Sequence, residues 1–340
     1  MTLTVAGFGL GGLGQLELQL FADMGDVDVI AGADPSGSAR KTFTSEFDAP
    51  SYETTDELLE EHTPDIVNVA SIHSVHYEQV DQALDAGAHV HVEKPMTTTV
   101  ADAVALVDAA AASNQQVQVG YQRHFDPRFR ELRECVESGG IGEPHFVDCH
   151  LEQDWVDYAK TWRGDPDLSG GGFLYDSGSH LLDVLLWTLD AEPVSVSAMI
   201  DEHSTGVDIN SALSVELERE DGRVTASAAL VGDGPTTPDV GDSLEIYGTD
   251  GRVSQDESGV TRTEPGEEPA SIPVEGETDF VTLTEAKLEN LLDAIRNESA
   301  VAVPPEHGLR AIALTEAAAI SAERGERVDV QPLIEDARSG

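Results

Sequence analysis

A glycine-rich turn near the N-terminus constrains the fold of this chain more than any other feature. The apolar run Leu3–Phe8 leads into Gly9-Leu10-Gly11-Gly12-Leu13-Gly14, and a helical pattern follows in which Leu16, Leu20 and Met24 share one side. In such a turn the first glycine permits the tight bend, the second lets a pyrophosphate approach the backbone, and the third lets the helix pack on the strand. This order predicts a dinucleotide-binding βαβ unit.

A carboxylate completes the pattern, because Asp34 stands twenty residues beyond Gly14, after the strand pattern Val27–Ala33. An acid at that place is suited to the adenosine ribose hydroxyls. The same G-x-G-x-x-G pattern also matches two residues earlier, at Gly7-x-Gly9-x-x-Gly12. The first register is preferred because it leaves a full strand before the turn. The residues predicted to hold the cofactor here are Gly9, Gly11, Gly12, Leu13, Gly14 and Asp34.

Asp34 favours NAD over NADP, since a 2′-phosphate would face a carboxylate of like charge. Arg40 and Lys41 lie shortly downstream and could reach such a phosphate, so NADP stays open.

Glu93-Lys94-Pro95 ends the strand pattern Ala88–Val92. A lysine at a strand end is often a solvated cap. However, ligands bind at the carboxyl ends of strands in open α/β sheets, and Pro95 biases the Lys94 backbone toward an extended turn. We therefore expect Lys94 beside the nicotinamide, with Glu93 on its ribose or carboxamide; the alternative for Glu93 is an ion pair with an arginine.

Ser71, His73 and His76 follow a strand pattern that ends at Ala70. They are expected along the path of the nicotinamide ribose. His76 could equally be an ordinary histidine at a helix N-terminus.

The charge is extreme: 19 basic residues face 65 acidic ones, for a formal net charge of −46. The acidic residues are spread along the sequence, which favours a protein adapted to high salt, because salt screens their repulsion. Nucleic acid and anionic membranes are not expected as partners. The chain has only four lysines (Lys41, Lys94, Lys160 and Lys287), so Lys94 is harder to explain as a surface residue without a function.

Cys135 and Cys149 are too few for a disulfide framework, and their spacing suggests no zinc site, so no metal is predicted. The N-terminal run is rich in glycine and lacks a basic segment before it, so neither a signal peptide nor a membrane span is expected. The predicted location is the cytoplasm.

The pattern divides near residue 125. Before it, strands and helices alternate, as in a doubly wound parallel sheet, so residues 1–125 are expected to form a Rossmann domain. Residues 126–340 are expected to form an α+β domain with a mainly antiparallel sheet. Its last helices, Glu285–Asn297 and Leu309–Glu323, could pack back on the first domain.

The strands of the second domain are expected at Val194–Ile200, Ser211–Glu218, Val224–Val231 and Ser243–Gly248, with a hairpin turn at Asp221-Gly222. Two stretches rich in Gly, Pro and acidic residues, Asp233–Asp242 and Glu257–Glu277, are predicted to be solvated loops.

Asp176 and His180 are four residues apart, on one face if the segment is helical. Histidine can accept or return a proton near neutral pH, and the acid could orient its ring or bind a hydroxyl. The alternative is that Asp176 caps a helix N-terminus and that His180 is a structural histidine with its hydrogen bonds made inside the protein.

Further candidates to bind substrate are Arg123 and Arg163, although each could instead form an inter-domain salt bridge. Trp155, Tyr158 and Trp162 could form an apolar wall against a sugar ring or belong to the core.

The chain resembles the Gfo/Idh/MocA oxidoreductases, the sugar and polyol dehydrogenases related to glucose–fructose oxidoreductase and myo-inositol dehydrogenase. The resemblance runs from Val5 to about Val330. One departure is Glu17, where many relatives have histidine; it is expected to matter little because the side chain should lie away from the chemistry. The motifs are the glycine turn with Asp34, Glu93-Lys94-Pro95, the stretch from Gly120 to Pro127, Trp162-Arg163, Gly170-Gly171-Gly172 with Asp176-x-x-x-His180, and Tyr247 to Gly251.

The resemblance implies a Rossmann domain and a C-terminal domain with a large open sheet, through which the enzyme assembles into dimers or tetramers. It also implies an NAD(P)-dependent oxidation of a secondary alcohol in a sugar, sugar acid or polyol. Lys94, Asp176 and His180 would be catalytic, with either Lys94 or His180 as the base. These three with Arg123, Trp162 and Arg163 would contact substrate. A nicotinamide-dependent sensor without turnover and an NAD-dependent glycosidase are the alternatives. The presence of lysine, aspartate and histidine together favours an enzyme.

Overall fold

The computed structural model describes residues 2–203, 205–234 and 241–339, and the chain separates into two compact units. The first comprises Met1–Thr97, Asp102–Gln122 and Phe280–Gly308, and the second Thr98–Ala101, Arg123–Asp279 and Leu309–Gly340.

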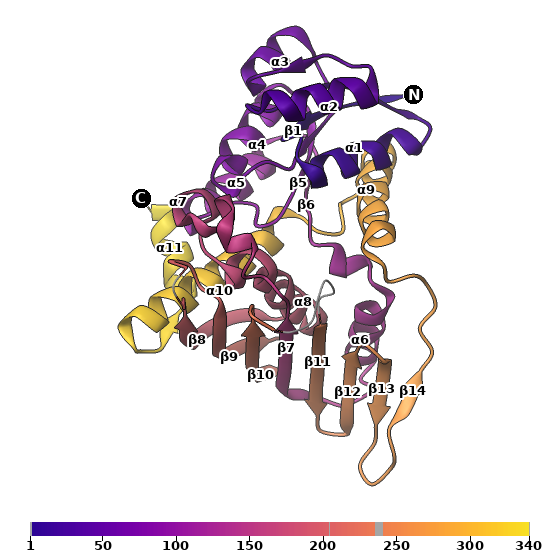
Figure 1. Ribbon diagram of the computed structural model, residues 1–340. Coiled ribbons are helices and arrows are strands. Elements are labelled where there is room, and N and C mark those ends of the chain that lie inside the picture. The colour runs from indigo at the N-terminus through magenta and orange to yellow at the C-terminus, as the bar shows by residue number, and fades with distance from the viewer. Residues whose placement is uncertain (1, 204, 235–240, 340) are drawn as a thin grey trace. The chain divides into compact units, whose positions relative to one another are not determined.

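The first unit contains a parallel sheet with strand order β3-β2-β1-β4-β5-β6 (Figure 1). The order reverses direction at β1, as in a doubly wound sheet. The predicted Rossmann architecture is therefore confirmed. The strands are β1 (Leu3–Phe8), β2 (Val27–Ala33), β3 (Ser51–Tyr52), β4 (Ile66–Val69), β5 (His89–Val92) and β6 (Val117–Val119).

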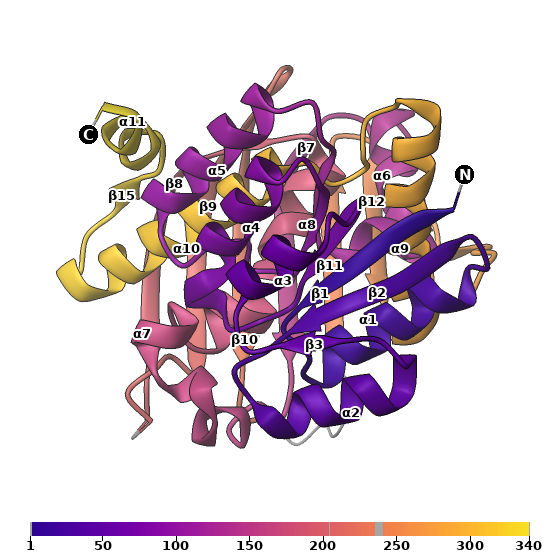
Figure 2. The ribbon, with the colours of Figure 1, turned by 90° about the horizontal axis from the view of Figure 1, so that it is seen from above.

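Helices flank this sheet on both sides, with α1 and α9 on one and α4 and α5 on the other (Figure 2). They are α1 (Gly12–Asp23), α2 (Gly37–Phe47), α3 (Thr55–Glu61), α4 (His76–Asp85), α5 (Val100–Ala112) and α9 (Phe280–Asn297), with the short 3₁₀ turn η1 (His73–Val75).

Helix α9 comes from late in the sequence yet packs beside α1 (Figures 1 and 2). Its Leu288, Leu291 and Leu292 join Leu18 and Phe21 of α1 in one buried cluster. Each such side chain contributes about 1.5–3 kcal/mol on burial. This apolar contact fixes α9 beside α1. It also places Lys287, the residue before Leu288, in a buried position.

The second unit is built on a sheet with order β14-β13-β12-β11-β7-β10-β9-β8-β15, visible as a row of strands in Figure 1. Every neighbouring pair is antiparallel except β7 and β10, so the expected mainly antiparallel sheet is confirmed. The strands are β7 (Pro144–Glu152), β8 (Glu192–Asp201), β9 (Asn210–Arg219), β10 (Gly222–Val231), β11 (Gly241–Gly248), β12 (Gly251–Asp256), β13 (Gly259–Thr263), β14 (Ala270–Ile272) and β15 (Val328–Asp329).

The helices of this unit include a π-helical turn, η5 (Leu174–Gly178), that runs directly into α8 (Ser179–Leu189). A π-helical turn is rare and occurs frequently at functional sites. The other helical segments are η2 (Gln122–Phe125), α6 (Pro127–Glu137), η3 (Tyr158–Lys160), η4 (Trp162–Gly164), α7 (Pro166–Ser169), α10 (Pro305–Arg324) and α11 (Gln331–Ser339).

One expectation about the second unit is wrong. The stretch Glu257–Glu277 is not only loop, because β13 and β14 pair within it. Alternating residues such as Val260 and Ile272 supply too short a pattern to stand out among Gly, Pro and Glu. Of the other expected loop, Asp233–Asp242, residues 235–240 lie outside the described part, and β11 begins at Gly241.

Candidate functional site

The glycine turn joins β1 to α1 with little space to spare. Gly9 has φ +90°, and a Cβ on Gly14 would come within 2.2 Å of the Gly9 carbonyl oxygen. At Gly11, which precedes α1, an added Cβ would meet nothing within 4 Å. The backbone of Gly11 therefore faces open space next to the free N–H groups of a helix N-terminus, which suits a pyrophosphate.

Asp34 is tied to this turn. Its Oδ2 accepts the Leu10 N–H at 2.8 Å and its Oδ1 accepts the Ser36 N–H at 2.7 Å. Carboxylate oxygens have further lone pairs for ribose hydroxyls. Arg40, the residue that could favour NADP, donates through Nη1 to the carbonyl oxygens of Asp34 (2.6 Å) and Pro35 (3.0 Å).

His76 links two of the predicted cofactor segments. Its Nδ1 lies 2.9 Å from the Pro95 carbonyl oxygen and its Nε2 lies 3.3 Å from that of Ser71. Burial lowers the pKa of His76, although both carbonyls act against this. A neutral imidazole has one N–H, and the shorter distance assigns it to Nδ1. His76 thus connects the turn after Lys94 to the loop after β4. Ser71 donates its hydroxyl to Gln79, and the His73 ring lies 5.6 Å from that of His76.

Lys94 follows β5 at the carboxyl edge of the sheet, and its peptide bond to Pro95 is cis. Its backbone N–H donates to Glu93 Oε2 at 3.2 Å. Gly9, Asp34, Ser71 and Lys94 follow β1, β2, β4 and β5 respectively, so the parallel sheet brings these predicted residues to one edge.

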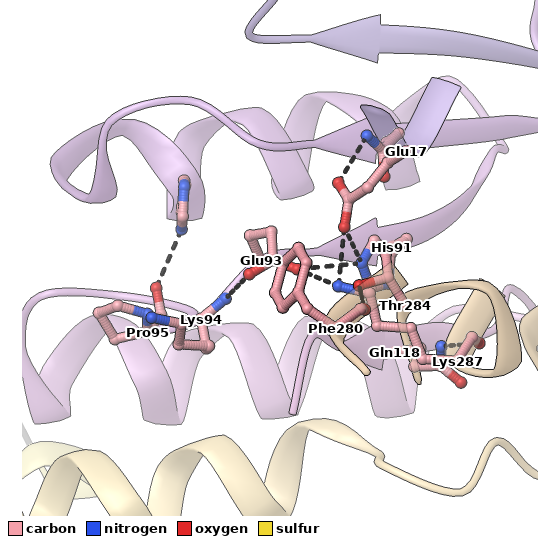
Figure 3. A network of polar contacts seen from close by, with 11 residues as sticks. Glu17, His91, Glu93, Lys94, Pro95, Gln118, Phe280, Thr284 and Lys287 are labelled. Atoms are coloured by element: carbon pink, nitrogen blue, oxygen red, sulfur yellow. Dashed lines mark hydrogen bonds and ion pairs between the residues drawn. The ribbon is translucent and has the colours of Figure 1, made fainter. Parts of the chain in front are cut away.

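Glu93 belongs to a buried polar cluster that sequence reasoning missed. Figure 3 shows Glu17, His91, Glu93 and Lys287 pointing toward one another. Lys287 Nζ lies 2.7 Å from Glu17 Oε1 and also pairs with Glu93 Oε1. Glu17, expected to lie away from the chemistry and to matter little, shares this ammonium with the acid next to Lys94. The expected alternative partner of Glu93, an arginine, is replaced by Lys287.

Asp176, in η5, is held by two side chains of its own unit. Its Oδ2 accepts Trp155 Nε1–H at 2.9 Å and Arg163 Nε–H at 3.0 Å. Arg163 also lies against the rings of Trp162 and Tyr158, 4.5 and 5.6 Å from their centroids. Trp155 is a buried hydrogen-bond donor rather than an open apolar wall, whereas Tyr158 is exposed.

His180 stands one turn beyond Asp176, in the first turn of α8, and is largely buried. Asp208 supports this helical segment, since its Oδ1 and Oδ2 accept the backbone N–H groups of Gly172 (2.6 Å) and Leu174 (2.5 Å). Burial raises the pKa of Asp208, while those two N–H groups act against it. The sequence around Asp208 carries no signal for this role, because its hydrogen-bond partners lie more than thirty residues earlier.

Arg123 pairs with Asp242 of the same unit at 2.7 Å, and each side chain is 11% exposed. The salt bridge expected as its alternative therefore exists, but it lies within the second unit rather than between domains. Lys94 belongs to the first unit, and Arg123, Arg163, Asp176 and His180 to the second.

Comparison with known proteins identifies the family. Residues 3–121 match the model "Oxidoreductase family, NAD-binding Rossmann fold", and residues 129–254 match "GFO/IDH/MocA C-terminal domain". The chain belongs to the Gfo/Idh/MocA oxidoreductases. The open backbone at Gly11 and the carboxylate of Asp34 fit the NAD that this Rossmann family binds.

Three similar proteins illustrate the range of the family. An uncharacterized oxidoreductase, C26H5.09c, of Schizosaccharomyces pombe is 38% identical over 44% of this chain and 40% of its own length. The rhizopine catabolism protein MocA of Rhizobium meliloti is 25% identical over 91% of this chain and 92% of its own. A levoglucosan dehydrogenase solved with NADH has a TM-score of 0.86 at 18% identity, covering 97% of this chain and 99% of that one. In the described part of the chain, every helix is too short or too polar to cross a membrane.

Proposed function

We propose that this family member is an NAD-dependent dehydrogenase that oxidises a secondary alcohol of a sugar, sugar acid or polyol. One observation carries the proposal: the carboxylate of Asp176 is aimed by Trp155 and Arg163, one turn before His180, in a rare π-helical turn. Such an arrangement suits a site that must hold a hydroxyl and move its proton. The levoglucosan dehydrogenase of the same fold, solved with NADH, supports a sugar as the substrate class.

In the proposed reaction His180 takes the hydroxyl proton, and Asp176 binds the substrate hydroxyl or orients the ring. Lys94 provides positive charge that stabilises the developing alkoxide oxygen. The bound nicotinamide supplies the acceptor for the hydride that leaves the carbinol carbon. The C–H electron pair thus leaves with the hydride while the O–H bond breaks and a C=O bond forms. Trp162, Arg163 and Arg123 complete the substrate region in this proposal.

NAD rather than NADP is the proposed cofactor. Asp34 presents a carboxylate where a 2′-phosphate would lie, and Arg40 is committed to two backbone carbonyls at the same turn.

We also propose that the protein works in a cytoplasm of high salt and as a homodimer or homotetramer. The exposed side chains of Phe146 and Met199 on the open sheet motivate an assembly through that face. Light scattering after size exclusion in KCl tests it, and a monomer at micromolar concentration would contradict it.

The function is tested by screening sugars, sugar acids and inositols for NADH formation in concentrated KCl. With a sugar that responds, Lys94→Ala and His180→Ala should each lose most turnover while NAD binding persists, whereas the exposed Arg324→Ala serves as control. In His180→Ala the dependence of turnover on pH near neutrality should also disappear. Near-wild-type turnover in Lys94→Ala would refute its catalytic role. NAD binding without NADH formation across the whole screen would favour a sensor.

A further inference from the structure

Lys287 is a buried lysine in a chain that has only four. It lies on α9 four residues after Leu283 and four before Leu291, on the buried face of a helix that packs beside α1 within the first unit. Its Nζ pairs with Glu17 from α1 and with Glu93 from the end of β5 (Figure 3). Three separate elements therefore meet at one ammonium group.

Stability alone does not account for this lysine. Replacing a buried ion pair by apolar side chains of similar volume is often neutral or stabilising. Leu283 and Leu291, one turn before and one turn after Lys287, are buried leucines of the same helix, and methionine resembles lysine in length and shape. The functional effect of the Lys287 ion pairs therefore depends on the group that its ammonium orients.

The group that it orients is the Glu93 carboxylate, which is held on every side. Oε1 pairs with Lys287, and Oε2 accepts the backbone N–H of Lys94 at 3.2 Å. Gly120 closes the third side, because a Cβ there would lie 2.5 Å from Oε1 and 3.1 Å from Oε2. In this arrangement the Glu93 carboxylate holds the backbone amide of the next residue, Lys94.

We propose that Lys287 is a positioning residue: by holding Glu93, it fixes the backbone from which Lys94 extends at the carboxyl edge of the sheet. Lys287 contacts neither cofactor nor substrate in this role and acts through Glu93. The inference rests on the proposed function insofar as Lys94 is catalytic.

A simpler role, charge compensation, must be separated from positioning. His91 Nε2 lies 3.4 Å from Glu17 Oε1 and 3.6 Å from Glu93 Oε1, longer than ordinary hydrogen bonds but close enough for ion pairs. With His91 protonated, the cluster holds two carboxylates and two cations. A lysine that served charge balance alone would be dispensable once one carboxylate was also removed.

The decisive variant is therefore Glu17→Gln/Lys287→Met, which removes one charge of each sign. The single variant Lys287→Met leaves an unbalanced buried carboxylate and is expected to melt lower. The double variant should melt close to wild type. Its kcat should nevertheless fall by about tenfold or more, with KM for NAD changed by less than about threefold, since small misplacements of a catalytic group cost up to about 100-fold. Arg324→Met, on the exposed end of α10, controls for the loss of a cation.

If kcat of the folded double variant recovers to within about twofold of wild type, the positioning role of Lys287 is overturned. Charge compensation would then be its role. Failure of the double variant to fold would also overturn the positioning role, because Lys287 would then be indispensable to the core itself.

Gly120→Ala provides an independent arm that changes no charge. Its methyl group would displace the Glu93 carboxylate without removing Lys287 or Glu17. The same loss of kcat, with NAD still bound, is expected. Unaltered kcat in this variant would contradict the inference.

A measurement without substrate separates this inference from the proposed function. After light reductive ¹³C-methylation, four lysines and the N-terminus give few NMR signals, and Lys94→Arg assigns that of Lys94. The Lys94 signal should move in Glu17→Gln/Lys287→Met and in Gly120→Ala, but not in Arg324→Met. If it moves while no sugar is oxidised, the proposed function fails and the positioning stands. If it stays fixed while Lys94→Ala abolishes turnover, the positioning fails alone.

Discussion

The ammonium of Lys287 lies 2.7 Å from Glu17 Oε1, where both side chains are buried between α1 and α9. Burial lowers the pKa of Lys287, but Glu17 and Glu93 outweigh it and the pKa is raised. For Glu93, burial acts to raise the pKa, yet Lys287 and His91 hold it well below its ordinary range. Both groups are therefore held in their charged forms, and the ion pairs of Lys287 with Glu17 and Glu93 tie the first and last parts of the Rossmann unit together.

A first prediction concerns the stability of this cluster against pH. Burial and Lys287 act to lower the pKa of His91, but the carboxylates of Glu17 and Glu93 outweigh them and raise it. A raised folded-state pKa means that the stabilisation is complete below about pH 6.5 and is lost as pH rises through the folded value. Urea unfolding from pH 6 to 9 should show this decline in wild type and a flatter profile in His91→Gln. The exposed His145→Gln is the control, and an identical decline in His91→Gln would assign it to another group.

A second prediction concerns Asp208, whose two oxygens hold the start of the segment that contains Asp176. In Asp208→Asn the amide nitrogen cannot accept, so one of the Gly172 and Leu174 N–H groups loses its partner at a cost of about 1–3 kcal/mol. Melting temperature and kcat should both fall, while NAD affinity should not. Asp167→Asn, an exposed acid of α7, should change neither. A normal kcat in Asp208→Asn would show that the helix start does not govern the chemistry.

A third prediction is the cofactor preference. Wild type should have a higher kcat/KM with NAD than with NADP, because the 2′-phosphate would meet the Asp34 carboxylate. In Asp34→Ser the ratio should move toward NADP by about tenfold, about 1.4 kcal/mol. Glu46→Gln, exposed on α2, removes an acid elsewhere and should leave the ratio unchanged. A wild type that prefers NADP, or an unmoved ratio in Asp34→Ser, would show that Asp34 does not discriminate.

A fourth prediction follows from the net charge of −46. The Debye length falls from about 10 Å at 0.1 M salt to about 3 Å at 1 M, so most mutual repulsion should vanish over that range. Thermal melts in KCl should rise steeply up to about 1 M and then level. A flat series would mean that the acidic residues are arranged without serious repulsion.

Sequence patterns were sufficient for the fold because they are local. The glycine turn, the strand that precedes it and Asp34 lie within thirty-odd residues, and hydrophobic alternation marks β9 and β10 with their tight turn. The sequence also indicated Glu93 and Lys94 correctly as residues at a strand end. The strands β13 and β14 were missed because they are short and lie among Gly, Pro and Glu.

The polar partners could not be predicted, since each depends on tertiary packing. Lys287 reaches Glu93 only because leucines of α9 dock that helix on α1, and Asp208 reaches Gly172 across a strand and two helical segments. One signal was nevertheless present: Lys287 interrupts an apolar stripe in a chain that uses lysine four times. A scarce charged residue on a buried helix face predicts a buried partner of opposite charge.

A deuterium label on the substrate tests directly whether a hydride is transferred from the carbinol carbon to the nicotinamide. A sugar or polyol identified by the NADH screen is prepared with deuterium at its reacting carbinol carbon and incubated with the enzyme and NAD in concentrated KCl. Proton NMR of the isolated cofactor then reports on C4 of the nicotinamide. We expect one deuterium at C4 for each molecule of ketone or lactone formed, in wild type but not in Lys94→Ala. Product formed with no deuterium retained on accumulated NADH, or a cofactor that binds and is never reduced, would contradict a dehydrogenase.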